Sequence, residues 1–64
     1  MPRYGDLVIL LSPRGKRRMM RVEEGRDWHT QDGVVSMADL AAAAFGSEVR
    51  TSLGVPFRVL RPQL

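Results

Sequence analysis

The chain has 64 residues, no cysteine, and a net charge of +3 that comes from nine arginines and one lysine against seven carboxylates. This length allows one domain, residues 1–64, with a small core, and the lack of cysteine excludes disulfides and thiolate metal sites. The hydrophobic fraction of 44% is typical of a globular protein and too high for a disordered one. The longest apolar run, Leu7–Leu11, is far too short to span a bilayer, so we expect a cytoplasmic protein with no membrane partner.

The preference for arginine over lysine is the most unusual feature of the composition. The planar guanidinium group suits bidentate contacts with phosphate, whereas the lysine ammonium is a point charge. A basic domain of this kind favours an anionic partner, most simply nucleic acid. A GC-rich genome, which encodes arginine in place of lysine, would produce the same composition, so both explanations stay open at this level.

Turn signals recur about every ten residues and separate short segments rich in Val, Leu, Ile and Phe, which predicts a mostly-β fold. We expect a small barrel or sandwich of five to six short antiparallel strands. The strand Leu7–Leu11 is apolar on both faces, so it should be covered on each side. Ser12-Pro13-Arg14-Gly15 has the form of a type I turn that pairs residues 16–22 back as a hairpin. Gln31-Asp32-Gly33 signals another hairpin.

One helix is predicted, from about residue 37 to about residue 45. Ser36 as the N-cap and Asp39 at the third helical position have the form of a capping box. The alanine run that follows has high helix propensity. Gly46 stands where a helix would end in a left-handed residue.

The last hairpin, residues 48–60, alternates between two faces. Val49, Thr51 and Leu53 should face the core, and Arg50 and Arg58 should face outward.

No active site is expected in these residues. His29 is the only histidine, and no cysteine or carboxylate cluster accompanies it at metal-ligand spacing. A catalytic triad cannot be assembled around it, and glycine never appears in a nucleotide-binding loop pattern. We therefore predict no catalytic, cofactor-binding or metal-binding residue, and no enzymatic activity for this chain alone.

Basic side chains are the candidate binding residues. The cluster in residues 14–18 either contacts phosphates at a hairpin tip or forms a solvated edge strand whose charge prevents aggregation. Like charges on one face of a sheet destabilise it, so Arg50 and Arg58 either bind an anion or are neutralised by Glu48. The candidate RNA-binding residues are Arg14, Lys16, Arg17, Arg18, Arg50, Arg58 and Arg61, with His29 and Thr30 as weaker candidates.

Several apolar side chains exceed what so small a core can bury. On a strand, Met19 and Met20 cannot both face inward, so one should pack inside while the other meets a neighbouring domain or subunit. Leu60 is expected outside the core. Trp28 is expected in the core or at an interface rather than stacked on RNA.

The motifs occur in an order that resembles one known family. They are Gly5-Asp6-Leu7-Val8-Ile9-Leu10, Gly15-Lys16-Arg17, Trp28-His29-Thr30 with Gly33, Asp39-Leu40, Gly46-Ser47, Val49, Arg50-Thr51-Ser52, Gly54, Phe57, Val59-Leu60-Arg61-Pro62 and Leu64. This set resembles the N-terminal domain of the bacterial and archaeal tRNA (adenine-N1)-methyltransferases that modify the T-loop adenine. Gln31 and Met37 stand where the family often has histidine, and Arg18 where it usually has an aromatic residue.

The resemblance implies a non-catalytic accessory domain that binds tRNA. Its partners would be tRNA, a Rossmann-like catalytic domain outside these residues, and the other subunits of a homotetramer. The cofactor of the full-length enzyme would be S-adenosylmethionine, with none bound by this chain. Two alternatives are a structural module that docks on the catalytic domain and stabilises the oligomer, and a free-standing basic β-barrel that binds nucleic acid.

Overall fold

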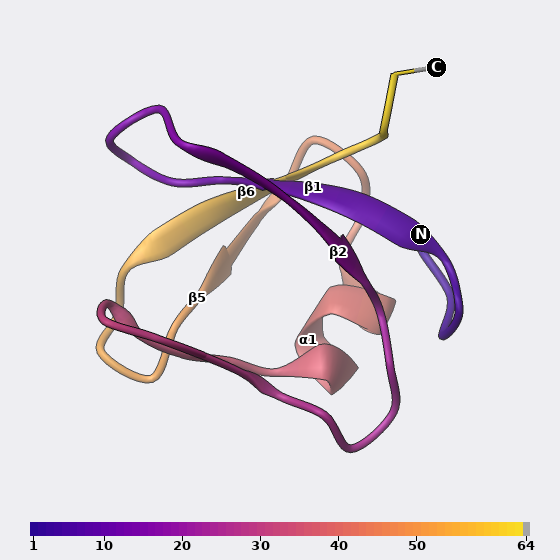
Figure 1. Ribbon diagram of the computed structural model, residues 1–64, viewed down its shortest axis with the longest axis horizontal. Helices are drawn as coiled ribbons and strands as arrows, with labels where there is room; N and C mark the ends of the chain where they lie inside the picture. The colour runs from indigo at the N-terminus through magenta and orange to yellow at the C-terminus, as the bar shows by residue number, and fades with distance from the viewer. Residues whose placement is uncertain (64) are drawn as a thin grey trace.

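The computed structural model describes residues 1–63, so Leu64, the last residue of the family resemblance, lies outside it. Its elements are β1 (Leu7–Leu11), β2 (Arg17–Arg21), β3 (Trp28–Thr30), β4 (Gly33–Val35), α1 (Met37–Ala42), β5 (Glu48–Arg50) and β6 (Pro56–Leu60). The strands form two antiparallel sheets, with the orders β2-β1-β6-β5 and β3-β4 (Figure 1). The predicted mostly-β fold with one short helix is confirmed, but no ladder of the described residues joins the two sheets into a closed barrel.

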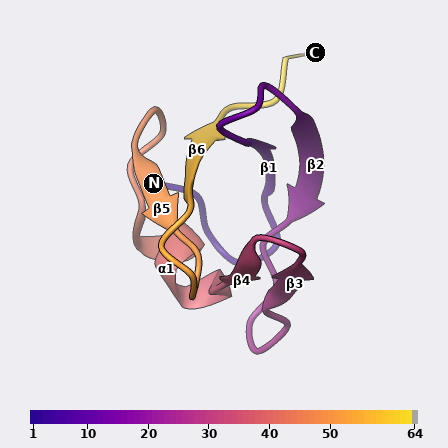
Figure 2. The same cartoon turned by 90° about the vertical axis from the view of Figure 1, so that its left-hand side faces the viewer.

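The core lies between the four-stranded sheet on one side and the β3–β4 hairpin with α1 on the other (Figure 2). Strand alternation points alternate apolar residues of β1, β5 and β6 inward, whereas the inner face of β2 carries Arg18 and Met20. Helix α1 adds the two buried residues of its inner face. The buried core residues are Val8, Leu10, Val22, Val35, Met37, Leu40, Val49, Phe57 and Val59. Of the two methionines, Met20 packs against this core and Met19 is exposed, as expected.

Strand β1 is covered on one face only. Val8 and Leu10 are completely buried, whereas Leu7 is 38% exposed and Ile9 and Leu11 are half-buried. The expectation that this strand is covered on each side was therefore wrong within the described residues. The apolar residues on its second face form part of the molecular surface.

Helix α1 begins as predicted but ends three residues early. The Ser36 hydroxyl accepts a hydrogen bond from the Asp39 N–H at 3.2 Å, which satisfies one of the free donors at the helix start. The helix stops at Ala42, because Ala43 already has an extended backbone, with φ −82° and ψ 142°. Beyond it the chain turns back toward the sheet, where the Gly46 N–H donates to the Val59 carbonyl at 2.7 Å. Gly46 does have a positive φ of 89°, but in a turn beyond the helix rather than at its C-terminal cap.

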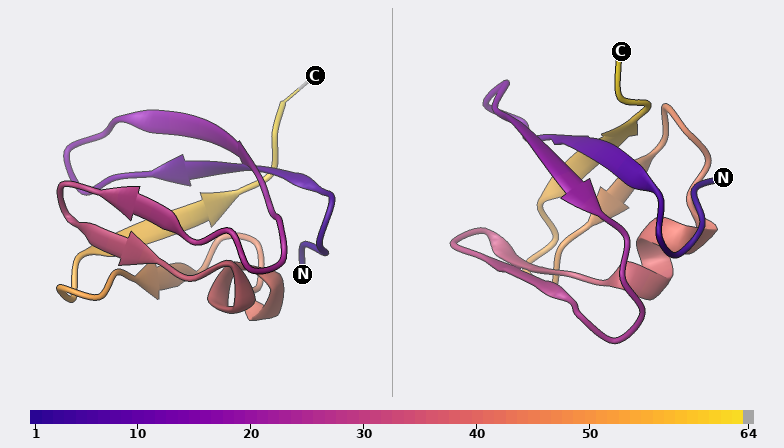
Figure 3. Two further views of the ribbon diagram at one scale, coloured as in Figure 1. Left: turned by 60° about the horizontal axis from the view of Figure 1, so that its bottom comes forward. Right: turned by 45° about the vertical axis from the view of Figure 1, so that its right-hand side comes forward.

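The loop between β5 and β6 joins the two sheets (Figure 3). The buried Thr51 donates its hydroxyl proton to the Asp32 carbonyl at 2.6 Å. Ser52 exchanges two bonds with Val34: its N–H donates to the Val34 carbonyl at 2.9 Å, and its hydroxyl accepts from the Val34 N–H at 2.8 Å. Leu53, predicted to face the core, is 72% exposed because the strand has already turned at this point.

Candidate nucleic-acid interface

The largest concentration of positive charge lies in a hollow between two hairpin tips, which we call the hairpin groove. It has a volume of about 400 Å³, with the β1–β2 turn on one side and β3 with its turn on the other. Its floor is apolar and includes Phe57. The charged side chains that line it are Arg14, Lys16, Arg17, Arg18 and Asp32, and its aromatic side chains are Trp28, His29 and Phe57.

The tight β1–β2 turn presents two of these cations. The Gly15 N–H donates to the Ser12 carbonyl at 2.9 Å, and the Ser12 hydroxyl accepts from the Lys16 N–H at 3.1 Å. Gly15 adopts a φ of 86°, which glycine tolerates without strain. The turn predicted from Ser12-Pro13-Arg14-Gly15 therefore holds Arg14 and Lys16 at the tip of the hairpin.

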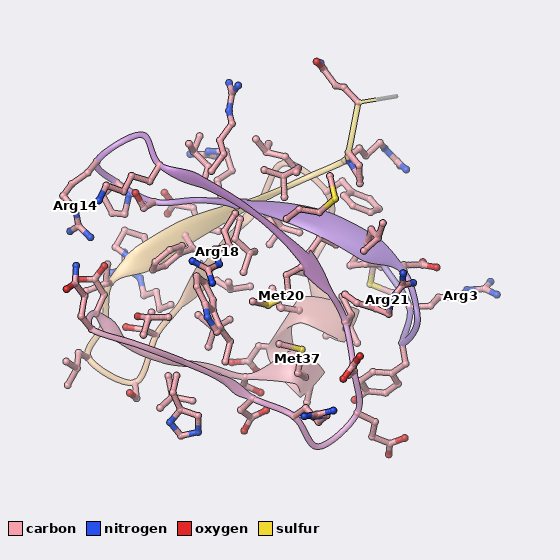
Figure 4. The ribbon with its side chains drawn as sticks, viewed as in Figure 1. Arg3, Arg14, Arg18, Met20, Arg21 and Met37 are labelled. Atoms are coloured by element: carbon pink, nitrogen blue, oxygen red, sulfur yellow. The ribbon has the colours of Figure 1, made fainter. Side chains whose placement is uncertain are left out.

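An ion pair joins the two tips at one end of the groove. The guanidinium of Arg14, which lies at the tip of the β1–β2 hairpin (Figure 4), donates to an Asp32 carboxylate oxygen at 2.7 Å. This hydrogen bond, together with the attraction between the charges, raises the pKa of Arg14 above its ordinary value. Arg14 thus stays cationic, but its charge is already matched by a carboxylate.

The register of β2 separates Arg17 from Arg18. Arg18 lies opposite the buried Leu10, so it is on the inner face of the sheet, whereas Arg17 lies opposite Leu11 on the other face. The Arg18 guanidinium lies 5.7 Å from the centre of the Trp28 ring, a typical cation–π arrangement. The basic cluster of residues 14–18 is therefore divided between the two faces of β2, and Arg17 lines both the hairpin groove and the hollow over the other face.

Positive charge in the groove exceeds negative charge. Four cations face a single carboxylate, Asp32, which is paired with Arg14. In the described part of the chain, Lys16, Arg17 and Arg18 take part in no ion pair. His29 and Thr30, the weaker candidates, also line the groove. The groove can therefore attract an anion and offers an aromatic ring and a planar guanidinium beside it.

The other three candidates lie outside the groove. Arg58 donates to the Gly46 carbonyl at 2.6 Å and pairs with Glu48 at 3.4 Å. The expected neutralisation by Glu48 therefore occurs, with Arg58 as the partner. Arg50 shares this face but lies opposite Pro56, and it donates to the Gly54 carbonyl at 2.9 Å. Arg61 lies 4.1 Å from the centre of the Phe45 ring.

The comparison with protein families identifies the fold. Residues 2–49 match the family described as TrmI-like N-terminal. The chain belongs to this family. A SAM-dependent O-methyltransferase from Thermotoga maritima has the same fold, with a TM-score of 0.90 and 24% identity. The alignment covers 97% of this chain and 23% of that one, so the chain spans less than a quarter of that methyltransferase.

This TrmI-like N-terminal domain also has an apolar outer face, formed by Leu7, Ile9, Leu11, Met19 and Leu60 on strands β1, β2 and β6. Met19 is 55% exposed at the centre of β2. A second hollow, of about 510 Å³, lies over this face and is lined by Ile9, Met19 and Leu60 among others. The surplus of apolar residues expected from the sequence is therefore gathered on one side of the sheet.

Among residues 1–63, no three His, Cys, Asp or Glu side chains gather as a metal site. None of the helices in that range has the length and apolar character needed to cross a membrane. The six glycines do not cluster in the sequence, and none lies at the start of α1, whose N-cap is Ser36. The described residues therefore contain no glycine-rich loop that leads into this helix.

Proposed function

We propose that this chain is the RNA-facing accessory domain of a SAM-dependent tRNA (adenine-N1)-methyltransferase of the cytoplasm. It binds tRNA through the hairpin groove and has no catalytic activity by itself. The observation that carries the proposal is the groove, where three cations without a carboxylate partner line the same hollow as Trp28, and one of them, Arg18, lies over its ring. Cations contact the phosphate backbone, and exposed aromatic and guanidinium planes stack on bases.

The family supports the link to a methyltransferase. The cofactor would bind elsewhere, because S-adenosylmethionine does not fit the residues present. A Rossmann-type cofactor site needs a glycine-rich turn that leads from a strand into a helix. Here α1 follows β4 through Ser36, and no glycine precedes it in that turn. The proposal therefore assigns methyl transfer to the remainder of the enzyme and binding to this domain.

Salt dependence tests the proposal. Each phosphate that a cation neutralises contributes about −0.9 to the slope of log affinity against log salt. We expect tRNA affinity to fall as salt rises from about 50 mM to about 200 mM. The double variant Lys16→Gln/Arg17→Gln should make this slope less negative by about two. At about 0.1 M salt this corresponds to a roughly 10- to 100-fold loss of affinity. NMR titration with unmodified tRNA measures both quantities.

A matched control is the double variant Arg3→Gln/Arg26→Gln, which removes the same charge outside the groove. Arg3 lies at the far end of the molecule from Arg14 (Figure 4). The control should retain most of the affinity. Equal losses in the two variants would mean that only net charge matters, and a flat salt dependence of the unaltered chain would contradict RNA binding altogether.

The apolar outer face favours a second function, docking on the catalytic domain of the same enzyme. The related methyltransferase has more than three quarters of its length outside the part that matches this chain. A catalytic domain of that size is large enough to cover the apolar outer face. Exposed apolar patches on small domains typically mark such interfaces. In this reading the domain also helps to hold the homotetramer together.

Self-association of the 64-residue chain tests the docking face. If this face is an interface, the chain should associate at high concentration, and Met19→Lys should weaken association by about tenfold or more, since an ammonium buried between Arg17 and Arg21 without a partner costs at least about 1.4 kcal/mol. Leu53→Lys is the control, because Leu53 is even more exposed but lies in the β5–β6 loop. Sedimentation velocity measures the association. A monomeric chain at all concentrations would argue against the interface.

A further inference from the structure

Three side chains in the hairpin groove form a layered arrangement. Phe57 is buried in the core, and the half-buried Trp28 meets it edge to face, with ring centroids 5.7 Å apart and an interplanar angle of 75°. Above the Trp28 ring lies the Arg18 guanidinium, at 5.7 Å from its centre. Arg18 itself is exposed and lines the groove. One side of the guanidinium is thus supported by an anchored indole, and the other side is open.

This support prepares Arg18 for stacking. An arginine side chain in water loses conformational freedom when it binds, but here the contact with Trp28 already restricts it. A guanidinium plane stacks on nucleic acid bases as aromatic rings do. The inward position opposite Leu10 on β2 directs Arg18 into the groove, away from the outer face (Figure 4).

The surroundings of Arg18 fit a single nucleotide. A volume of about 400 Å³ lies within the range of about 300–1,000 Å³ that small-molecule sites have. Lys16 and Arg17 line the same groove and have no carboxylate partner in the described range, so they are available to a phosphate. His29 and Gln31 also line it, and their side chains can donate and accept hydrogen bonds at a base edge.

We propose that the hairpin groove binds one unpaired nucleotide of RNA, with its base stacked on the open side of Arg18 and its phosphate held by Lys16 and Arg17. This inference rests on the proposed function and specifies which part of an RNA the domain recognises. A base inside a duplex is stacked on both sides and cannot reach Arg18. A loop or an unpaired end presents its bases freely.

Fluorescence tests this directly, because Trp28 is the only tryptophan of the chain. A short single-stranded RNA, a duplex of the same sequence and an abasic strand of the same length are each titrated into the 64-residue chain. Stacking on an aromatic or guanidinium plane contributes about 1–3 kcal/mol per base, which corresponds to an affinity ratio of about 5 to 150. We expect the single strand to bind more tightly than both other probes by this ratio and to change the Trp28 emission.

The variant Arg18→Lys separates stacking from charge, because it retains the cation and removes the planar surface. It should lose the preference for the single strand while its salt slope stays unchanged. Arg21→Lys is the matched control: the same substitution on the same strand, but opposite Leu7 on the outer face. It should retain the preference. Thermal unfolding of both variants checks that each is folded.

The outcomes distinguish the two proposals. Equal affinities for the three probes, with the dependence on Lys16 and Arg17 intact, would overturn the nucleotide site and leave RNA binding in place. A preference that survives Arg18→Lys would overturn the stacking arrangement. No binding of any probe at low salt would overturn both the nucleotide site and the proposed function.

Discussion

Gly33→Ala should destabilise the domain by about 2–5 kcal/mol, a large part of the roughly 3–10 kcal/mol expected for a domain of 64 residues. Gly33 has a φ of 109°, which is unfavourable for a residue with a Cβ. A Cβ at this position would lie 2.9 Å from each of three atoms: the Leu53 nitrogen, the Ser52 hydroxyl and the Thr51 hydroxyl. Strain accounts for about 1–2 kcal/mol, and overpacking for about 1–3 kcal/mol.

The three atoms cannot easily move aside. The Leu53 nitrogen belongs to the backbone, and it donates to the Thr51 hydroxyl at 3.2 Å. The Ser52 hydroxyl accepts from Val34 at 2.8 Å. Displacing the Leu53 nitrogen breaks a bond within the β5–β6 loop, and displacing the Ser52 hydroxyl breaks a bond that joins the two sheets. We therefore expect the loss of stability to include loosening of the β3–β4 hairpin.

Gly25→Ala is the matched control for Gly33→Ala. Gly25 also has a positive φ, 76°, but a Cβ there would meet nothing within 4 Å. It should cost only the conformational strain of about 1–2 kcal/mol. Urea unfolding followed by Trp28 fluorescence gives both free energies. Equal losses for the two variants would show that the close approach at Gly33 contributes nothing.

Local pattern was enough to predict most of the elements. Alternation and turn residues predicted β1, β2 and the β3–β4 hairpin, and the Ser36 cap predicted the start of α1. These features depend on neighbours in the sequence. The end of the helix does not follow the local alanine pattern, because the chain becomes extended at Ala43 and Gly46 bonds to Val59, which is thirteen residues further along.

The candidate site was only partly predictable, for a related reason. The basic residues were visible in the sequence, and period-2 alternation already places Arg17 and Arg18 on opposite faces. Adjacent positions in the sequence are therefore not adjacent on the surface of this strand. The contacts that build the groove, Arg14 with Asp32 and Arg18 with Trp28, join segments that only the tertiary fold brings together. No local pattern indicated that Asp32 neutralises one of the four cations.

The second large effect is expected at Thr51, whose hydroxyl group joins the β5–β6 loop to the β3–β4 turn. It donates to the Asp32 carbonyl at 2.6 Å and accepts from the N–H groups of Leu53 and Val55, each at 3.2 Å. Thr51→Val preserves the shape of the side chain and removes all three bonds. Since a buried polar group without a partner costs about 1–3 kcal/mol, we expect a loss of about 2–4 kcal/mol in the free energy of unfolding.

Thr51→Ser separates the contribution of the hydroxyl group to stability from that of the methyl group. It retains the three hydrogen bonds and loses one buried methyl, so it should cost about 1 kcal/mol. Amide hydrogen exchange adds a local measurement, since the N–H groups of Leu53 and Val55 should exchange faster in Thr51→Val and stay protected in Thr51→Ser. Equal stability and exchange in both variants would mean that the hydroxyl does not stabilise the connection between the β5–β6 loop and the β3–β4 turn. If it does, Thr51→Val also frees the turn that carries Asp32, and the Arg14–Asp32 pair at the end of the hairpin groove should weaken with it.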